Sequence, residues 1–140
     1  MSTVRGVYAV VVGCGRLGLY LAGALSESGC SVVVVDIDSS RFLDLGAGFS
    51  GFTIEGDAVE LATLEQSKIG KADIFIAATG SDSVNLMVSQ IARTIYGVKK
   101  VATRIYDPAL EPQCRRADLL PISTVTTAAV SVLRALGLQE

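Results

Sequence analysis

Residues Val10-Val-Val-Gly-Cys-Gly-Arg-Leu-Gly18, VVVGCGRLG, carry the clearest indication of the fold. A run of valines leads into three glycines with the spacing G-x-G-x-x-G, which is typical of a strand, a tight turn and the start of a helix. Gly13 permits the turn, Gly15 lets the backbone approach a pyrophosphate, and Gly18 allows close packing of helix on strand. The first helical turn offers unpaired N–H groups and a positive dipole end, so the stretch predicts a phosphate site.

An acidic residue at the end of the next apolar run supports that prediction. Asp36 follows the valines at 32–35, and its carboxylate can accept hydrogen bonds from both ribose hydroxyls of an adenine nucleotide. A 2′-phosphate at that place would face both Asp36 and Asp38, and like charges set against each other cost several kcal/mol. We therefore expect an adenine nucleotide as the ligand and not NADP. Arg41 either offsets part of the negative charge or is exposed on a helix.

Short apolar runs alternate with helical patterns along the chain. Runs without polar alternation, such as VVVV at 32–35, indicate strands that are buried on both faces. Leucines at i, i+4 and i+8 and similar repeats indicate the helices between them. Expected strands are 8–12, 32–35, 51–54, 74–78, 101–105 and, weakly, 118–121; expected helices are 17–25, 59–66, 84–95 and 123–136. The alternation predicts an α/β fold: a Rossmann-like, doubly wound, mainly parallel six-stranded sheet with helices on both faces.

Length, charge and composition exclude several classes of protein. The 140 residues, half of them apolar, predict one folded domain over residues 1–140. With 12 basic against 14 acidic side chains, nothing points to nucleic acid. The apolar runs fall far below the about 20 residues that span a membrane, and the N-terminus has no secretion-signal pattern. Three irregularly spaced cysteines fit a reducing cytoplasm rather than a disulfide framework. Histidine, the commonest general base and metal ligand, is absent, so we expect no metal site and no catalytic residues.

Five motifs together resemble a known family. VVGCGRLG at 11–18, VVVVDID at 32–38, GDA at 56–58, ATGSDSVN at 78–85 and ATRIYDP at 102–108 occur in the order found in RCK N-terminal domains, also called TrkA-N or KTN domains. The resemblance covers about residues 6 to 137. Such domains are cytoplasmic regulators of bacterial potassium channels and transporters, and they bind NAD, NADH, ATP or ADP as sensors.

The resemblance implies a set of nucleotide-contacting residues, carried over position by position. They form a phosphate loop, a ribose-binding acidic segment, a group at the adenine edge, a loop that passes over the ligand, two polar positions spaced D..N, and an arginine on the phosphate side. The residues are Gly13, Cys14, Gly15, Arg16, Leu17, Gly18, Asp36, Ile37, Asp38, Arg41, Gly56, Asp57, Ala58, Ala78, Thr79, Gly80, Asp82, Asn85 and Arg104.

Structural roles remain open for several of these residues. Asp57 can simply cap the following helix, and Asp82 can be an N-cap alone. Arg104 at a strand end can be a structural ion-pair partner, and Arg16 either reaches the phosphates or faces solvent. Cys14 is either a reactive thiol or a small residue that fills space.

The resemblance also implies partners. Domains of this family assemble as dimers, and often as octameric rings, beneath an integral-membrane potassium channel or transporter, which would place this chain at the inner face of the cell membrane. The final helix, within 123–137, carries apolar residues at helical spacing and is expected at a dimer interface; packing against its own sheet is the alternative. The stripe is Val125, Ala129, Val132, Leu133 and Leu136.

The sequence departs from the family pattern at two places. Many relatives continue into a second ligand-binding domain, whereas this sequence ends at Glu140. Ile122 stands where several nucleotide-gated relatives carry an acidic residue associated with metal, which favours NAD(H) or a nucleotide bound without metal.

The sequence indicates that the bound nucleotide is a regulatory signal and not a reagent for catalysis. A dehydrogenase needs a second site for its substrate and groups that move protons, and we find neither a histidine nor a Ser/Tyr/Lys grouping. We therefore expect a regulatory subunit and no enzyme. The alternative is a dinucleotide-binding fragment of an NAD-dependent oxidoreductase.

Overall fold

The fold is one six-stranded sheet in the order β3-β2-β1-β4-β5-β6. The computed structural model describes residues 6–139, so residues 1–5 and 140 of the expected domain lie outside the described part. The strands are β1 (Tyr8–Val12), β2 (Ser31–Asp36), β3 (Phe52–Glu55), β4 (Ile74–Ala77), β5 (Lys100–Ile105) and β6 (Leu120–Ser123). The helices are α1 (Arg16–Glu27), α2 (Leu61–Gln66), α3 (Asp82–Thr94), α4 (Glu111–Arg116) and α5 (Thr124–Ala135), with 3-10 turns η1 (Ser39–Asp44), η2 (Ile69–Lys71) and η3 (Pro108–Leu110).

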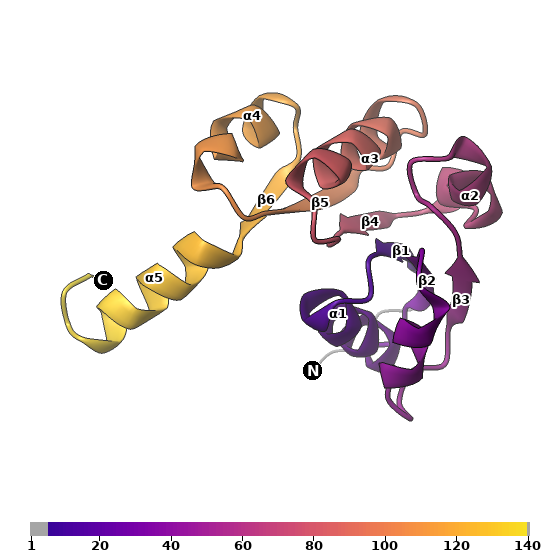
Figure 1. The fold of residues 1–140 in the computed structure, drawn as a ribbon, viewed down its shortest axis with the longest axis horizontal. Helices are drawn as coiled ribbons and strands as arrows, with labels where there is room; N and C mark the ends of the chain where they lie inside the picture. The colour runs from indigo at the N-terminus through magenta and orange to yellow at the C-terminus, as the bar shows by residue number, and fades with distance from the viewer. Residues whose placement is uncertain (1–5, 140) are drawn as a thin grey trace.

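All five strand pairings are parallel, which confirms the predicted Rossmann-like sheet. The sheet separates two apolar cores, and alternate residues of β1 point into opposite cores: Val10 and Val12 into one, Val11 into the other. Helices α2, α3 and α4 cover the first core, and α1 with η1 covers the second (Figure 1). Burial on both faces is why β1 and β2 are runs of valine without polar alternation.

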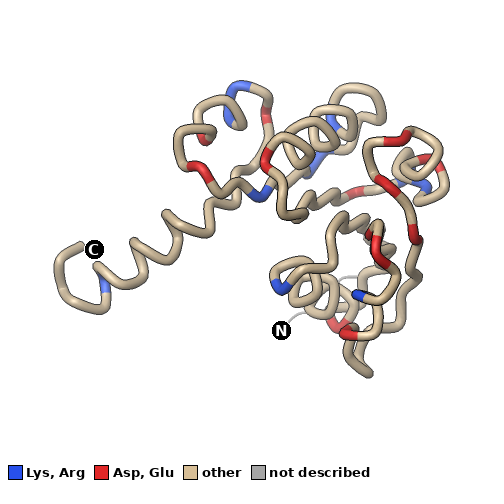
Figure 2. The backbone as a smooth tube through the Cα atoms, in the orientation of Figure 1, with Lys and Arg blue, Asp and Glu red and all other residues tan. Residues whose placement is uncertain are grey.

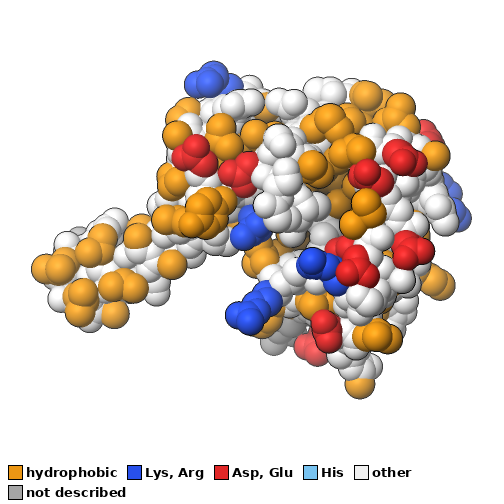
Figure 3. Space-filling model, in the orientation of Figure 1, with side chains coloured by type: hydrophobic (Ala, Val, Ile, Leu, Met, Phe, Trp, Pro, Cys, Tyr) orange, Lys and Arg blue, Asp and Glu red, His pale blue; other side chains and the backbone are white. Residues whose placement is uncertain are grey.

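The last helix, α5, packs on neither face of the sheet. Figure 1 shows it leaving the end of β6 as an arm, and none of its residues is buried. The exposed fractions of Val125, Val132 and Leu136 are 42%, 56% and 65%. Apolar atoms run along the arm in Figure 3. The charged residue of α5 is Arg134, and Figure 2 shows no acidic position along this helix. The predicted apolar stripe is therefore exposed, and the alternative that it packs on its own sheet is wrong.

Two predictions about local structure are corrected by the fold. Asp82 is not an N-cap: Ser81 caps α3, its hydroxyl accepting from the N–H of Val84, and Asp82 lies in the first turn. Ser81 directly precedes Asp82, and serine is also a favourable N-cap residue, so the predicted cap position was one residue too late. The strand expected at 118–121 is observed two residues later as β6, because α4 and its terminal turn occupy the preceding residues.

Candidate functional site

The carboxyl ends of the parallel strands form one edge of the sheet. Val12 pairs with Val35 on one side and Ala77 on the other, and Arg104 pairs with Ile122. The loops after β1, β2, β4, β5 and β6 therefore meet at this edge. Ligands of open α/β sheets bind in the crevice outside this edge, where the strand order reverses between β1 and β4.

Two glycines of the loop after β1 are required by close packing. Gly13 has a φ of 102°, and a Cβ there would lie 2.6 Å from the carbonyl carbon of Ala78. A Cβ on Gly18 would lie 1.8 Å from the carbonyl oxygen of Gly13. These two residues thus fix how tightly α1 and the loop after β4 approach the turn, and the absence of a side chain at Gly18 is required by packing.

Gly15 faces open space instead. It is the N-cap of α1 with ordinary extended backbone, φ −73° and ψ −174°, and a Cβ added there would meet nothing within 4 Å. No side chain caps this end of α1, and its first turn contains no acidic residue. The backbone N–H groups of the first turn are therefore available to an anion, which is the arrangement that favours phosphate.

Asp36 ties the loop after β1 to the end of β2. One carboxylate oxygen accepts from the backbone N–H of Cys14 at 2.7 Å, and the other accepts from the N–H of Asp38 at 2.8 Å. The side chain is 9% exposed, so its orientation is fixed before any ligand arrives. Each carboxylate oxygen has a further lone pair with which to accept a hydroxyl hydrogen.

Asp38 and Arg41 lie beside Asp36 at the surface. Hydrogen bonds from the Ser40 hydroxyl and then its backbone N–H lower the pKa of Asp38, with a further contribution from the Arg41 charge. The Arg41 Nε lies 3.9 Å from the Asp38 carboxylate. Both side chains are about half exposed, so Arg41 is a partly solvated residue that offsets some of the negative charge here.

A buried amide connects the loop after β4 to β5. Asn85, fully buried on α3, accepts from the N–H and the hydroxyl of Thr79 and donates to the backbone oxygens of Thr79 and Arg104. The Arg104 guanidinium donates to the Thr79 backbone oxygen at 2.9 Å. Arg104 is thus held by a hydrogen bond and not by an ion pair among residues 6–139.

Two adjoining hollows occupy this edge. The nucleoside-side hollow, about 590 Å³, is lined by Val12, Gly13, Val35, Asp36, Ile37, Asp38, Arg41, Gly56, Asp57, Ala58, Thr79, Gly80, Ser81 and Val84. The phosphate-side hollow, about 440 Å³, is lined by Gly13, Gly15, Arg16, Leu17, Arg41, Ala78, Thr79, Gly80, Arg104 and Thr124. Four residues line both hollows, so one elongated ligand can occupy the two together: Gly13, Arg41, Thr79 and Gly80.

Four predicted site residues line neither hollow. Cys14 is buried in the α1 core, where burial and the neighbouring Asp36 charge raise its pKa to about 12, so it is a space-filling thiol. Gly18 and Asn85 have the packing and loop-holding roles described above. The Asp82 carboxylate accepts from the backbone N–H groups of Tyr106 and Asp107 and so holds the loop after β5.

The alternative that Asp57 caps the following helix is wrong. Asp57 accepts from the N–H of Val59, two residues on, and does not cap α2, whose N-cap is Glu60. Sequence reasoning missed Thr124 in the phosphate-side hollow. The feature that could have identified Thr124 is its position directly after the last expected strand, at the same edge of the sheet as the glycine loop.

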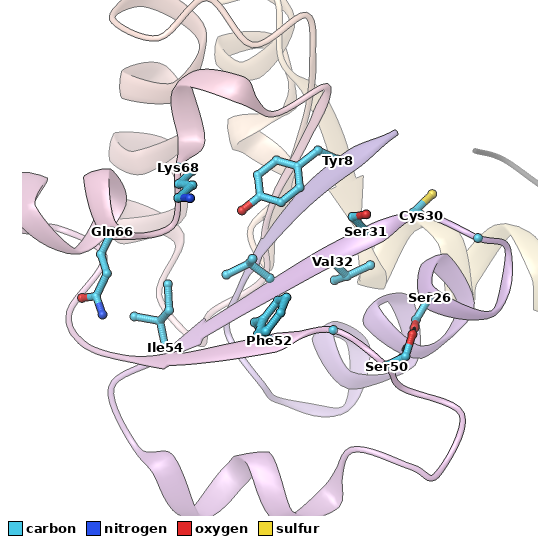
Figure 4. A pocket seen from close by; sticks show the side chains of 13 residues that line it. Tyr8, Ser26, Cys30, Ser31, Val32, Ser50, Phe52, Ile54, Gln66 and Lys68 are labelled. Atoms are coloured by element: carbon cyan, nitrogen blue, oxygen red, sulfur yellow. Dashed lines mark hydrogen bonds between the residues drawn. The ribbon is translucent and has the colours of Figure 1, made fainter. Parts of the chain in front are cut away.

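A further hollow lies at the opposite, amino-terminal end of the sheet (Figure 4). It measures about 560 Å³ and lies between Tyr8, Phe52, Gln66 and Lys68. Polar groups around it bond to the protein itself, the Tyr8 hydroxyl donating to the Ser67 backbone oxygen. This end of a parallel sheet is not where its ligands bind, and none of the predicted site residues lies there.

Within residues 6–139, no cluster of three or more acidic, cysteine or histidine side chains could hold a metal ion. Of the helices in the same range, none has both the length and the apolar content needed to cross a bilayer.

Comparison with known proteins decides the family. The TrkA-N domain model matches residues 9–127. The chain belongs to the TrkA-N domain family. This TrkA-N domain is 36% identical to the Trk system potassium uptake protein TrkA of Streptomyces coelicolor over 93% of its own length and 58% of that protein. It is 30% identical to a TrkA homolog of Methanothermobacter thermautotrophicus over 81% of its length and 52% of the homolog. The chain thus spans about half the length of these curated relatives.

Solved structures share the fold of this TrkA-N domain. The TrkA-N domain of the inner membrane protein ybaL from Escherichia coli superposes with a TM-score of 0.82 at 18% identity, covering 92% of this chain and 96% of that one. The AMP-bound Kef CTD of Shewanella denitrificans gives 0.79 at 22% identity, covering 94% and 80%. GsuK bound to ADP gives 0.79 at 22% identity, covering 93% and 33%, and a GsuK channel bound to NAD gives 0.73 at 21%, covering 91% and 23%.

Proposed function

We propose that this TrkA-N domain senses an adenine nucleotide and thereby regulates a potassium transport system. The observation that carries the proposal is the open cradle at the carboxyl edge, where Gly15 and the uncapped start of α1 face a hollow next to the fixed Asp36 carboxylate. The role in potassium transport is proposed from the names of the curated relatives, which are potassium uptake proteins. The ligand class agrees with the AMP, ADP and NAD bound in solved structures of the same fold.

The two hollows suggest how a nucleotide lies. The adenosine part occupies the nucleoside-side hollow, with Asp36 accepting from the ribose hydroxyls and the backbone at Asp57 and Ala58 meeting the adenine edge. The phosphates extend over Gly15 toward Arg16 in the phosphate-side hollow. ATP, ADP and NAD(H) fit this arrangement.

NADP does not fit it, because its 2′-phosphate would lie against the carboxylates of Asp36 and Asp38. Asp36 already accepts two backbone hydrogen bonds in a fixed orientation and cannot turn away. Arg41 is half exposed and 3.9 Å from Asp38, so it offsets only part of that repulsion.

The output of the domain is a change in how two copies of the chain are arranged. The apolar stripe of α5 is exposed, and on the α1 side of the sheet Ile74, Ala102 and Ile122 are only partly buried. A second copy that supplies its own α5 would cover these surfaces, giving a homodimer and, in multiples, the ring expected for the family. Nucleotides that favour different angles between the two copies then shift the populations of two dimer arrangements. Changing their ratio from 1:99 to 99:1 requires a difference of about 5.5 kcal/mol between the binding free energies of the ligand for the two arrangements.

In this arrangement the domain is a regulator and not an enzyme. It works in the cytoplasm, held at the inner face of the membrane by an integral-membrane potassium channel or transporter. Arg16 would discriminate among ligands, because it lines the phosphate-side hollow into which phosphate chains of different length would extend. Replacing Arg16 with Ala is expected to change the relative affinities of ATP, ADP and NADH.

Potassium uptake in the host cell tests the regulatory role. The chromosomal copy is replaced by a Gly15→Ala variant, and rubidium uptake is measured in potassium-limited cells with matched protein levels. We expect uptake to lose its normal regulation, while the Gly23→Ala variant, whose new methyl also meets nothing within 4 Å, behaves as the parent. Unaltered uptake in the Gly15→Ala strain would contradict the proposal.

A further inference from the structure

Helix α5 begins inside the candidate site. β6 ends at Ser123, which caps α5 by accepting from the N–H of Thr126, and Thr124 is the first helical residue. Because Arg104 pairs with Ile122 across β5 and β6, the start of α5 lies beside Arg104 at the carboxyl edge. Thr124 lines the phosphate-side hollow, and among the residues that line it Thr124 is the one that belongs to α5.

The phosphate-side hollow is strongly positive. Arg16, Arg41 and Arg104 line it, and no carboxylate does. Two helices, α1 and α5, begin at it, and neither has an acidic residue in its first turn. Three guanidinium groups and two positive helix ends favour an anion with several charges over the neutral or cationic half of a dinucleotide.

Two of the groups that would meet that anion, on Thr124 and Arg16, have no other partner among the described residues. In residues 6–139 neither the Thr124 hydroxyl nor the Arg16 guanidinium has a hydrogen-bond or ion-pair partner. Arg104, by contrast, is held by the Thr79 backbone oxygen, and Arg41 lies near Asp38. A free hydroxyl at the mouth of a positive hollow is available to donate to a phosphate oxygen.

We propose that Thr124 binds the outer phosphates of a nucleoside polyphosphate and so reports the length of the phosphate chain directly to α5. The inference rests on the proposed function, since it places the same nucleotide in the same cradle. The α-phosphate lies at Gly15, and the β- and γ-phosphates extend between Arg16 and Arg104 to the first turn of α5. A monophosphate bound at Gly15 has no outer phosphate to offer Thr124, so it would leave the first turn of α5 as it is without ligand.

Thr124 is therefore a positioning residue. The arm formed by α5 touches the body mainly through β6, so a bond between ligand and first turn changes the orientation of the whole helix. A polyphosphate would hold α5 in one orientation, and a monophosphate would not. This gives the exposed apolar stripe of α5 a direct connection to the occupant of the cradle.

A Thr124→Val variant of the purified protein tests the inference, because valine keeps the shape and removes the hydroxyl. Calorimetric titration with ATP, ADP and AMP is combined with hydrogen exchange of the α5 amides at saturating ligand. In the parent, ATP is expected to slow exchange in the first turn of α5 and AMP is not. In the variant, ATP affinity falls about tenfold or more, as for loss of a hydrogen bond to a charged group, and AMP affinity is unchanged.

Thr127→Val is the matched control, since Thr127 is exposed on the same helix and does not line the hollow. It should bind and exchange as the parent does. Equal loss of ATP affinity in both variants, or parental ATP affinity and α5 protection in Thr124→Val, would overturn the inference while nucleotide binding itself stands. NADH is titrated alongside these three nucleotides. If the parent binds NADH and none of the three, the inference is overturned while the proposed function stands; if it binds none of the four, the proposed function is wrong as well.

Discussion

Replacing Gly15 by Ala should strongly weaken nucleotide binding and leave the fold intact. A glycine substitution that disturbs both the fold and the phosphate contacts cannot show which of the two lowers the affinity. Gly15 differs from Gly13 and Gly18, because its backbone is in a region open to every residue and a Cβ meets nothing within 4 Å. The added methyl group would instead stand in the space through which a phosphate approaches the N–H groups of α1.

The expected effect on stability is small. Alanine is a poorer N-cap than glycine by about 0.5–1 kcal/mol, and it reduces the entropy of the unfolded chain by about 0.4–1 kcal/mol. These contributions oppose each other, so the net change in the free energy of unfolding is within about 0.5 kcal/mol, and Tm moves by no more than about 3 °C.

The expected effect on binding is large. A methyl group that holds phosphate away from two backbone donors removes two hydrogen bonds to a charged group, each contributing about 1.5 kcal/mol or more. The affinity for ATP or NADH should fall about a hundredfold or more. Calorimetric titration measures Kd, and thermal unfolding of the same samples measures Tm.

Gly23→Ala is the control for the general effect of replacing a glycine in this region. Its Cβ also meets nothing within 4 Å, and it lies within α1, where alanine is stabilising by about 0.5–1 kcal/mol. It should bind as the parent and unfold at a slightly higher temperature. Parental affinity in Gly15→Ala, with an unchanged Tm, would refute the reasoning that phosphate lies over this residue.

The structure supports four further predictions. Gly18→Ala should destabilise the domain by about 3 kcal/mol or more in urea unfolding, because its Cβ would overlap the Gly13 carbonyl oxygen; a parental midpoint would contradict this. Asn85→Leu should cost about 3 kcal/mol in the same assay by leaving the groups at Thr79 without partners, whereas a near-neutral result would show that water replaces the amide. The raised pKa of Cys14 means that stability decreases by about 1.4 kcal/mol for each pH unit between the ordinary thiol pKa of 9.0 and about 12, since the unfolded thiol ionises there and the folded one does not; Cys14→Ala should flatten this slope. Val132→Asp on α5 should shift the protein from dimer to monomer in analytical ultracentrifugation with little change in Tm, and an unchanged sedimentation coefficient would remove α5 from the interface.

Much of the fold was predictable because its local signals agree with one another. Valine runs without polar alternation require burial on both faces, and that pattern predicted β1 and β2 correctly. Boundaries were less certain: the expected strand 74–78 ends at Ala77, and the expected helix 59–66 begins at Leu61. The short helix α4 was missed because six residues contain too few turns for a periodicity to be seen.

The candidate site was predictable in outline and not in detail. The spacing of Gly13, Gly15 and Gly18 identified the turn, but only the coordinates separate the two glycines that packing requires from Gly15, which it does not. Asn85 was chosen as a possible ligand contact, whereas the structure places it beneath the site as a buried support. Thr124 could not be found from a motif, because its place in the hollow depends on the pairing of β5 with β6, which is a long-range property of the fold.

Whether this domain senses adenine nucleotides is tested by calorimetric titration of the unmodified protein with ATP, ADP, AMP, NAD, NADH and NADPH, with and without Mg²⁺. A hydride-exchange assay with a small oxidant is run on the same samples. We expect binding of at least two adenine nucleotides, no binding of NADPH and no turnover. Failure to bind any of them, or binding confined to nicotinamide cofactors with hydride exchange, would contradict this expectation.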